Sequence, residues 1–170
     1  MSDQRPHIVF VCTGNAARSV MGAAMLRART DRFRISGAGT FVIEGLPMSV
    51  RTRKALANHE LSEPAHRSRQ LREEHFEDAD LVVAFAPDHV EYVRRQHPEW
   101  AGKVGTLRRL VRDLAADGRP LSDRVAELGL GDVDIEPWEE VVDPAGGDQG
   151  VFDRCADEVA ELISALDSRL

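Results

Sequence analysis

One stretch near the start of the chain, His7 to Arg29, limits the possible folds more than any other. Its first part, Ile8 to Val11, is apolar and rich in β-branched residues, which predicts a buried strand. Its last part, Val20 to Leu26, is apolar at helical spacing, which predicts a helix. Between them lies CTGNAARS, in which five residues separate a cysteine from an arginine. A strand, a glycine-containing loop and a helix in this order predict an anion cradle, because loop N–H groups and the helix dipole can face one point.

The residues of this loop suit phosphate chemistry. Cys12 follows the strand at the N-terminal end of the helix, a position that favours the thiolate, which can attack phosphorus. Arg18 has a planar guanidinium that can bind two phosphate oxygens at once. Gly14 can adopt a positive φ angle and Asn15 tolerates one, so the chain can curl around a small anion. Ser19 can donate its hydroxyl hydrogen to the sulfur. A lone cysteine at a strand end is more often a buried packing residue than a nucleophile. The prediction of an anion site therefore depends on the Gly-Asn turn and the arginine that follow Cys12.

Strand and helix patterns alternate along the rest of the chain. Leu81 to Phe85 are apolar throughout, as is typical of a parallel-sheet strand with helices on both faces. The alternation predicts an α/β fold with a parallel sheet. A length of 170 residues, with 42% hydrophobic and 30% charged, suits a single domain over residues 1–170. We predict strands at 33–36, 79–85 and 103–106, and helices at 48–58, 73–78, 87–97, 107–114, 122–128 (capped by Ser122) and 151–166.

Composition narrows the classes of partner. The net charge of -7 gives the surface as a whole no obvious attraction to nucleic acid or an anionic membrane. No apolar run approaches the ~18–20 residues of a membrane-spanning helix, and the polar residues 1–6 do not predict a signal peptide. Two distant cysteines form no disulfide framework, which fits a reduced, cytoplasmic setting. We expect no metal or organic cofactor, since no metal-ligand spacing links His7, His59, His75, His89 and His97.

The chain resembles the low-molecular-weight protein tyrosine phosphatase family, which also includes related arsenate reductases. The resemblance runs from Ile8 to about Leu166. The family implies a single domain with a four-stranded parallel sheet, helices on both faces, and hydrolysis of phosphotyrosine without a metal. The motifs that carry the resemblance are VCTGNAARS at 11–19, AGT at 38–40, GLP at 45–47, HRSRQL at 66–71, ADLVV at 79–83 and Asp143-Pro144.

The resemblance also implies a role for individual residues. Cys12 would be the nucleophile that forms a cysteinyl-phosphate, and Arg18 would bind phosphate and stabilise transition-state charge. Asp143 would protonate the leaving oxygen and then activate water, although an Asp-Pro pair elsewhere is usually a turn. His66 would buttress the loop, whose shape Asn15 and Ser19 would hold. The residues expected to bind substrate are Thr13, Gly14, Asn15, Ala16, Ala17, Arg18 and Ser19.

The cysteines depart from the family pattern. Many members have a second cysteine in the loop that can protect the first as a disulfide, and here that position is Ala17. A local protective disulfide is therefore not available. The other cysteine, Cys155, falls in the predicted last helix, where we expect it to pack as a small apolar residue.

The region around the expected acid also departs from the family. Eukaryotic members have tyrosines after Asp-Pro, whereas residues 145–147 here are Ala-Gly-Gly. Phe41 and Trp138 are the candidates to contact a substrate ring in their place, although packing is the more common role for such residues. The stretch 117–142 is longer than is usual before the acid loop and is expected to be an insertion. It could restrict access to the site, but the sequence does not define its path.

Two other functions use the same loop. Arsenate resembles phosphate, so an arsenate reductase that uses a small cellular thiol needs only Cys12; a thioredoxin-coupled relay is excluded unless Cys155 is mobile, because residues 86–115 contain no cysteine. An inactive phosphotyrosine- or anion-binding module is the other alternative, although such a protein would be expected to have lost Cys12, Arg18 or Asp143. The expected partners are a phosphotyrosine protein or a small aryl phosphate, with a cognate tyrosine kinase left open.

Overall fold

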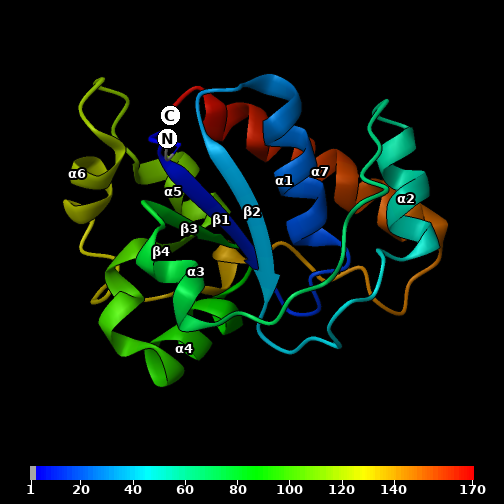
Figure 1. Ribbon diagram of the computed structural model, residues 1–170, viewed down its shortest axis with the longest axis horizontal. Helices are drawn as coiled ribbons and strands as arrows, with labels where there is room; N and C mark the ends of the chain where they lie inside the picture. Colours follow the sequence, from blue (N-terminus) through cyan, green and yellow to red (C-terminus); the bar gives the residue numbers. More distant parts are fainter. Residues whose placement is uncertain (1–2) are drawn as a thin grey trace.

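A computed structural model describes residues 3–170, so Met1 and Ser2 of the polar N-terminal stretch lie outside the described residues. A single four-stranded parallel sheet with strand order β2-β1-β3-β4 forms its centre (Figure 1). The strands are β1 (His7–Cys12), β2 (Arg34–Gly39), β3 (Leu81–Ala84) and β4 (Val104–Thr106). The helices are α1 (Arg18–Arg29), α2 (Val50–Ala57), α3 (Glu73–Glu77), α4 (Pro87–Gln96), α5 (Leu107–Asp113), α6 (Leu121–Ala126) and α7 (Gln149–Asp167), with short 3₁₀ helices η1 (Pro98–Lys103) and η2 (Pro137–Glu139).

The two central strands bury side chains on both faces, as their apolar sequences predict. In β1, Ile8 and Phe10 join one core cluster, whereas Val9 and Val11 join another. Alternate residues of β3 divide in the same way, because successive side chains of a strand point to opposite faces. The predicted α/β fold with a parallel sheet and helices on both faces is therefore confirmed.

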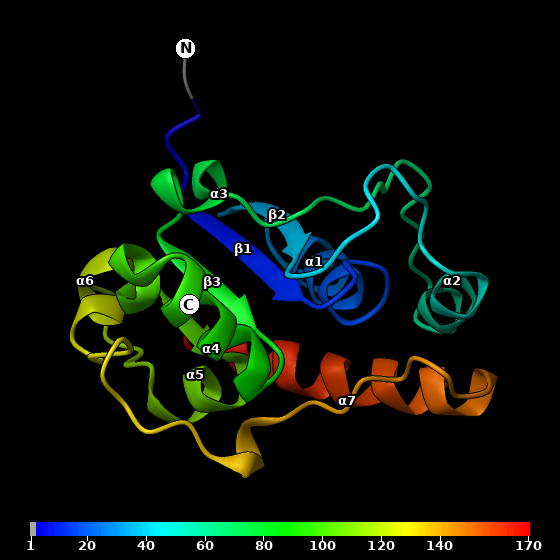
Figure 2. The ribbon, with the colours of Figure 1, turned by 90° about the horizontal axis from the view of Figure 1, so that it is seen from below.

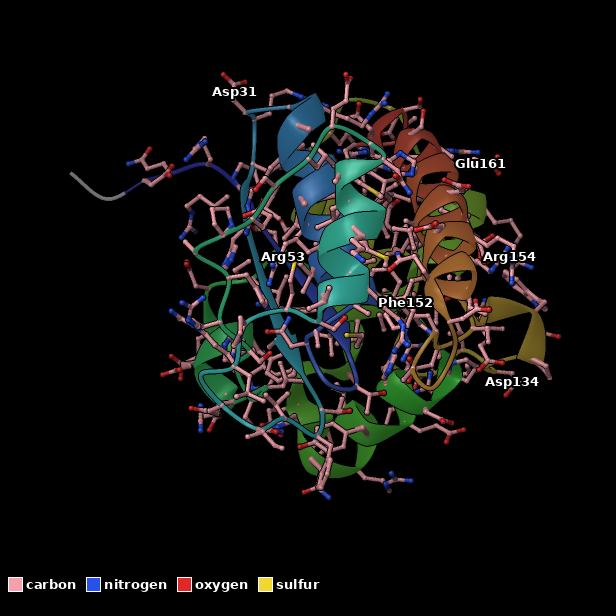
Figure 3. All side chains as sticks on the ribbon, turned by 90° about the vertical axis from the view of Figure 1, so that its right-hand side faces the viewer. Asp31, Arg53, Asp134, Phe152, Arg154 and Glu161 are labelled. Atoms are coloured by element: carbon pink, nitrogen blue, oxygen red, sulfur yellow. The ribbon has the colours of Figure 1, made fainter. Side chains whose placement is uncertain are left out.

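The helices form a layer on each face of the sheet. Helices α1, α5 and α7 contribute to one cluster, and α3 and α4 to the other. Helix α2 packs against the N-terminal half of α7 (Figure 2). Figure 3 views this side of the molecule, with Arg53 of α2 and Phe152 of α7 labelled. No helix in residues 3–170 combines the length and the apolar character needed to cross a lipid bilayer.

The carboxyl ends of the strands meet at one edge of the sheet, which lies at the bottom of Figure 1. Cys12, the last residue of β1, is in register with Gly39, the last residue of β2. Strand β3 lies on the other side of β1 and leads into Phe85 and helix α4. In open parallel sheets this edge is the usual place for a ligand, because loops from several strands converge there.

Several element boundaries differ from those predicted, mostly by one or two residues. Strand β2 continues to Gly39, beyond the predicted end at residue 36. Helix α6 begins at Leu121 with Pro120 in the N-cap position, so Ser122 lies inside the helix and the predicted cap is wrong. Helix α7 begins at Gln149 because the Asp148 side chain accepts a hydrogen bond from the backbone N–H of Val151 at 3.1 Å.

The stretch 117–142 does not cover the site along most of its length. Helix α6 lies beside η1, near the start of β3 and β4, at the far end of the sheet from Cys12. Arg124 of α6 donates hydrogen bonds to the carbonyl oxygens of Ala115, Arg169 and Leu170, which ties the helix to the C-terminus. The last part of the stretch, η2 and the residues after it, reaches the edge of the sheet that holds Cys12. Thr106 at the end of β4 donates to Glu139, and the N–H of Val141 donates to the Phe85 carbonyl oxygen.

Candidate active site

The loop after β1 begins with two backbone carbonyl groups that point towards the end of β2. The carbonyl oxygen of Cys12 accepts a hydrogen bond from Thr40 N–H at 3.0 Å, and that of Thr13 accepts one from Phe41 N–H at 2.9 Å. This approach requires a glycine at position 39, because a Cβ atom there would lie 2.4 Å from the Thr13 carbonyl oxygen. The AGT motif therefore fixes the first half of the loop.

Asn15 fixes the second half of the loop. Its φ angle is 50°, and its carbonyl oxygen accepts hydrogen bonds from His66 Nε2 at 2.8 Å and Ser68 Oγ at 2.9 Å. Its side-chain Oδ1 accepts the N–H of Arg69 at 3.0 Å. Burial lowers the pKa of His66, which favours a neutral ring that donates from Nε2. Of the two adjacent residues that can adopt a positive φ angle, Asn15 adopts it and Gly14 does not.

The remaining loop carbonyls also point away from the centre of the loop. Thr52 Oγ1 of α2 donates to the Ala16 carbonyl oxygen at 2.8 Å, and Met21 N–H of α1 donates to that of Ala17 at 2.9 Å. In contrast, none of the backbone N–H groups of residues 14–17 donates to another group within residues 3–170. Unpaired N–H groups at a helix N-terminus can bind the oxygens of a tetrahedral anion.

Cys12 lies at the base of this cradle. It is 3% exposed, and its Sγ is 3.0 Å from Oγ of Ser19. The Ser19 oxygen accepts a hydrogen bond from Asn15 Nδ2 at 2.8 Å, which leaves the Ser19 hydroxyl hydrogen free for the sulfur. Ser19 can therefore stabilise a thiolate through a charge-assisted hydrogen bond.

Arg18 connects the cradle to the loop that contains Asp143. Its Nη1 donates to the Val141 carbonyl oxygen at 2.9 Å, and its Nη2 is 3.4 Å from Asp143 Oδ2. The N–H of Val141 in turn donates to the Phe85 carbonyl oxygen at 2.7 Å, just after β3. The Arg18 side chain is only 4% exposed, whereas that of Asp143 is 47% exposed. Residues separated by most of the chain thus converge around one cradle, with a solvent-accessible carboxylate at its mouth.

His89 was not predicted as a site residue, but it belongs to the same site. Its Nε2 is 3.0 Å from Thr13 Oγ1, and its Nδ1 accepts the N–H of Phe85 at 3.2 Å. Burial, together with the charge of Arg18, lowers the pKa of His89 to about 3. A sequence signal was available, because a histidine in the first turn of the helix after a buried strand lies at the edge where ligands bind.

The two candidate aromatic contacts differ in position. Phe41 is next to the cradle through its bond to Thr13, and its side chain is 83% exposed. Trp138 lies instead against two arginines of α5, with the Arg112 and Arg109 guanidinium carbons 4.3 Å and 5.6 Å from its ring centroid. Its Nε1 donates to Glu136 at 2.8 Å. Trp138 is therefore a packing residue away from the cradle.

The side chains of two further residues, Cys155 and Ala17, pack in the core. Cys155 is 6% exposed on α7, and burial raises the pKa of its thiol to about 12, so it is a protonated packing residue. Ala17 packs against the larger core cluster. Residues 3–170 contain no group of three or more His, Cys, Asp or Glu side chains arranged to hold a metal ion.

Known proteins are similar to this chain in sequence and in fold. A protein-arginine-phosphatase from Geobacillus stearothermophilus is 32% identical over 164 residues, covering 96% of this chain and 95% of that protein. A low-molecular-weight protein tyrosine phosphatase from T. tengcongensis has a structure with a TM-score of 0.78 and 29% identity, covering 97% and 99% of the two chains. A YwlE arginine phosphatase, solved as a cysteine-to-serine mutant with a phosphorylated active-site serine, has a TM-score of 0.75 and 27% identity, covering 94% and 92%.

The family model for low-molecular-weight phosphotyrosine protein phosphatases matches residues 7–126. This range includes the cradle, its supports from β2 to residue 69, and His89, but it ends before Asp143. Relatives that align with nearly the whole chain extend the similarity to the segment that contains Asp143. The resemblance inferred from the sequence is thus confirmed: the chain belongs to the low-molecular-weight phosphotyrosine protein phosphatase family.

Proposed function

We propose that this protein hydrolyses phosphotyrosine in proteins, or other aryl phosphate monoesters, through a cysteinyl-phosphate intermediate. In the first step, the Cys12 thiolate attacks phosphorus while the P–O bond to the aryl group breaks, and Asp143 gives its proton to the leaving oxygen. In the second step, Asp143 takes a proton from water as the water attacks phosphorus. The S–P bond breaks, which releases phosphate and regenerates the thiolate.

The convergence of Cys12, Arg18 and Asp143 on one cradle is the observation that carries this proposal. The unpaired N–H groups of residues 14–17 and the Arg18 guanidinium supply donors for the charge that develops on phosphate oxygens. The phosphorylated active-site serine of the cysteine-to-serine relative supports covalent transfer of the phosphoryl group to an active-site side chain.

Asp143 is suited to the mouth of the cradle rather than to its base. Its Oδ1 accepts the N–H of Ala145 at 3.0 Å, which orients the carboxyl group, while Oδ2 points towards Arg18. A phosphate bound to Arg18 would compete for this contact and leave Oδ2 to face the leaving oxygen. Support for the aromatic substrate comes from Phe41, whose backbone is bonded to the loop at Thr13 and whose ring is exposed.

Phosphoarginine in proteins is a second candidate substrate. It is favoured by the arginine phosphatase names of relatives that align with nearly the whole chain. The acid loop also lacks aromatic residues, since Ala-Gly-Gly follows Pro144. The same three residues would act, with Asp143 protonating the leaving nitrogen.

One experiment separates these substrates. We would compare hydrolysis of a phosphotyrosine peptide, hydrolysis of a phosphoarginine protein and thiol-dependent arsenate reduction, with Cys12→Ser as the blank. Peptide hydrolysis that disappears in the blank, and that Phe41→Ala weakens through KM, supports the phosphotyrosine proposal. Activity confined to phosphoarginine or to arsenate would replace that proposal, and oxyanion binding without turnover of any substrate would indicate a binding module.

The proposed setting is the cytoplasm, where a reducing environment preserves a free Cys12. The proposed partners are the phosphoprotein substrate and a kinase that supplies it. Nucleic acid and membranes are not proposed as partners.

A further inference from the structure

A buried histidine supports the cradle from the side of β3. His89 lies in the first turn of α4 and is 2% exposed. Because the N–H of Phe85 donates to Nδ1 at 3.2 Å, Nδ1 carries no hydrogen. The neutral ring therefore carries its hydrogen on Nε2 and donates it to Thr13 Oγ1 at 3.0 Å. Both ring nitrogens are satisfied, which fixes the orientation of the imidazole.

The Thr13 hydroxyl receives two hydrogen bonds from its neighbours. His89 Nε2 donates to its oxygen at 3.0 Å, and Arg18 Nη2 donates to the same oxygen at 3.4 Å. A hydroxyl has two acceptor lone pairs and one hydrogen, so these two bonds leave the hydrogen without an acceptor. The same Arg18 Nη2 is 3.4 Å from Asp143 Oδ2, so the Thr13 hydroxyl lies on the side of the cradle that holds Asp143.

We propose that His89 is a positioning residue that acts through Thr13. It holds the Thr13 oxygen against Arg18, which fixes the plane of the guanidinium, and it directs the Thr13 hydroxyl hydrogen towards the bound phosphoryl group. A neutral donor suits this place, because a second cation behind Thr13 would repel Arg18. The inference deepens the proposed function, since it concerns the phosphoryl group that Cys12 would attack.

Three substitutions test the two halves of this relay. His89→Asn keeps an oxygen near the place of Nδ1, which can accept the Phe85 N–H, but it has no donor that reaches Thr13. His89→Gln is longer, and its amide N–H₂ can reach the Thr13 oxygen. Thr13→Val keeps the shape of the side chain and removes the hydroxyl. Val90→Ala is the matched control, because Val90 is 3% exposed on the same helix but belongs to the packing cluster on the far side of the sheet from Cys12.

The assay is steady-state hydrolysis of p-nitrophenyl phosphate, together with inhibition by orthovanadate. We expect His89→Asn to lower kcat by about 10- to 100-fold, as small displacements of a catalytic group do, with KM changed by less than about threefold. His89→Gln should recover part of the loss. Thr13→Val should lose a similar factor, and the double variant should lose no more than either single variant, because both changes break one relay.

Three results would overturn the inference: a kcat within about twofold of wild type in His89→Asn, additive losses in the double variant, or an equal loss in Val90→Ala. The proposed function fails separately, if wild-type protein does not hydrolyse the aryl phosphate. In that case the same variants are compared by calorimetric binding of orthovanadate. Matched, non-additive weakening in His89→Asn and Thr13→Val would still support the relay, and unchanged or absent binding would reject it.

Discussion

On two sides of the cradle a buried side chain donates a hydrogen bond to a hydroxyl group, but the contacts on one side are shorter and more buried than on the other. On the rear flank, Asn15 Nδ2 donates to Ser19 Oγ at 2.8 Å, and both residues are at most 1% exposed. On the front flank, His89 donates to Thr13, which lies beside Arg18 and the half-exposed Asp143 at contacts of 3.4 Å. In each case a buried side chain donates a hydrogen bond to a hydroxyl oxygen, so that the hydroxyl hydrogen can donate to another group. The rear flank therefore fixes the hydrogen-bond donor that faces the Cys12 sulfur, whereas on the front flank the Asp143 carboxylate is held only loosely.

Removing the nucleophile should have the largest effect and should separate chemistry from binding. We expect Cys12→Ser to abolish turnover, because a neutral hydroxyl replaces a thiolate, while Arg18 and the loop N–H groups still bind orthovanadate. Kinetics and calorimetry on the same preparation measure the two properties. Turnover equal to that of wild type would contradict the nucleophilic role of Cys12.

Asp143→Ala tests the front flank. The loss should be about 10²- to 10⁴-fold for aryl phosphates with poor leaving groups and much smaller for activated esters, because proton donation matters most when the leaving oxygen is basic. A plot of log kcat/KM against the pKa of the leaving phenol should therefore steepen in this variant. A uniform loss across the series would argue against the acid role.

Asn15→Ala tests the rear flank through stability. Alanine at φ 50° lacks the side-chain bonds to Ser19 and Arg69, so we expect the free energy of unfolding to fall by about 2–3 kcal/mol. Asp143→Ala, on the exposed flank, should change it by less than about 0.5 kcal/mol. Urea unfolding of both variants measures the contrast, and equal losses would remove the proposed difference between the flanks.

The smallest effect concerns the dependence of stability on pH. In the unfolded state the pKa of His89 has its ordinary value of 6.5, whereas in the folded state burial and the charge of Arg18 lower this pKa to about 3. The unfolded state thus binds more protons in this window, and wild type loses stability as the pH falls. Between pH 7.5 and 5.5 the stability difference between wild type and His89→Asn should narrow by about 1.4 kcal/mol. Parallel urea curves with no change in this difference would contradict the shifted pKa.

Local patterns predicted much of this molecule. The strand, loop and helix around Cys12 follow from residues that are neighbours in sequence, and His66 donates to the carbonyl oxygen of Asn15 within the loop, as its expected supporting role requires. The contact between Thr13 and His89 depends on the pairing of β1 with β3, which alternating elements do not specify. The sequence allows a positive φ angle at both Gly14 and Asn15, and turn propensities do not say which of these adjacent residues adopts it; in the structure it is Asn15.

The path of residues 117–142 could not be predicted because long-range polar contacts determine it. Arg109 of α5 donates to Glu139 at 2.8 Å, and Glu139 is 1% exposed. Thr106 donates to the same carboxylate, and Arg109 also donates to the Asp134 carbonyl oxygen. In the sequence Glu139 is one of several acidic residues between positions 132 and 140, and only the three-dimensional structure shows that it is buried and paired.

The two backbone hydrogen bonds of Val141 have a consequence for how this sequence can diverge. They attach the chain to Phe85 and Arg18 two residues before Asp143, so the starting point of the loop that carries Asp143 is fixed. Insertions and deletions upstream, in the segment around α6, can then accumulate without displacing the carboxylate. Val141 thereby separates a part of the chain that is free to vary in length from the loop that carries Asp143.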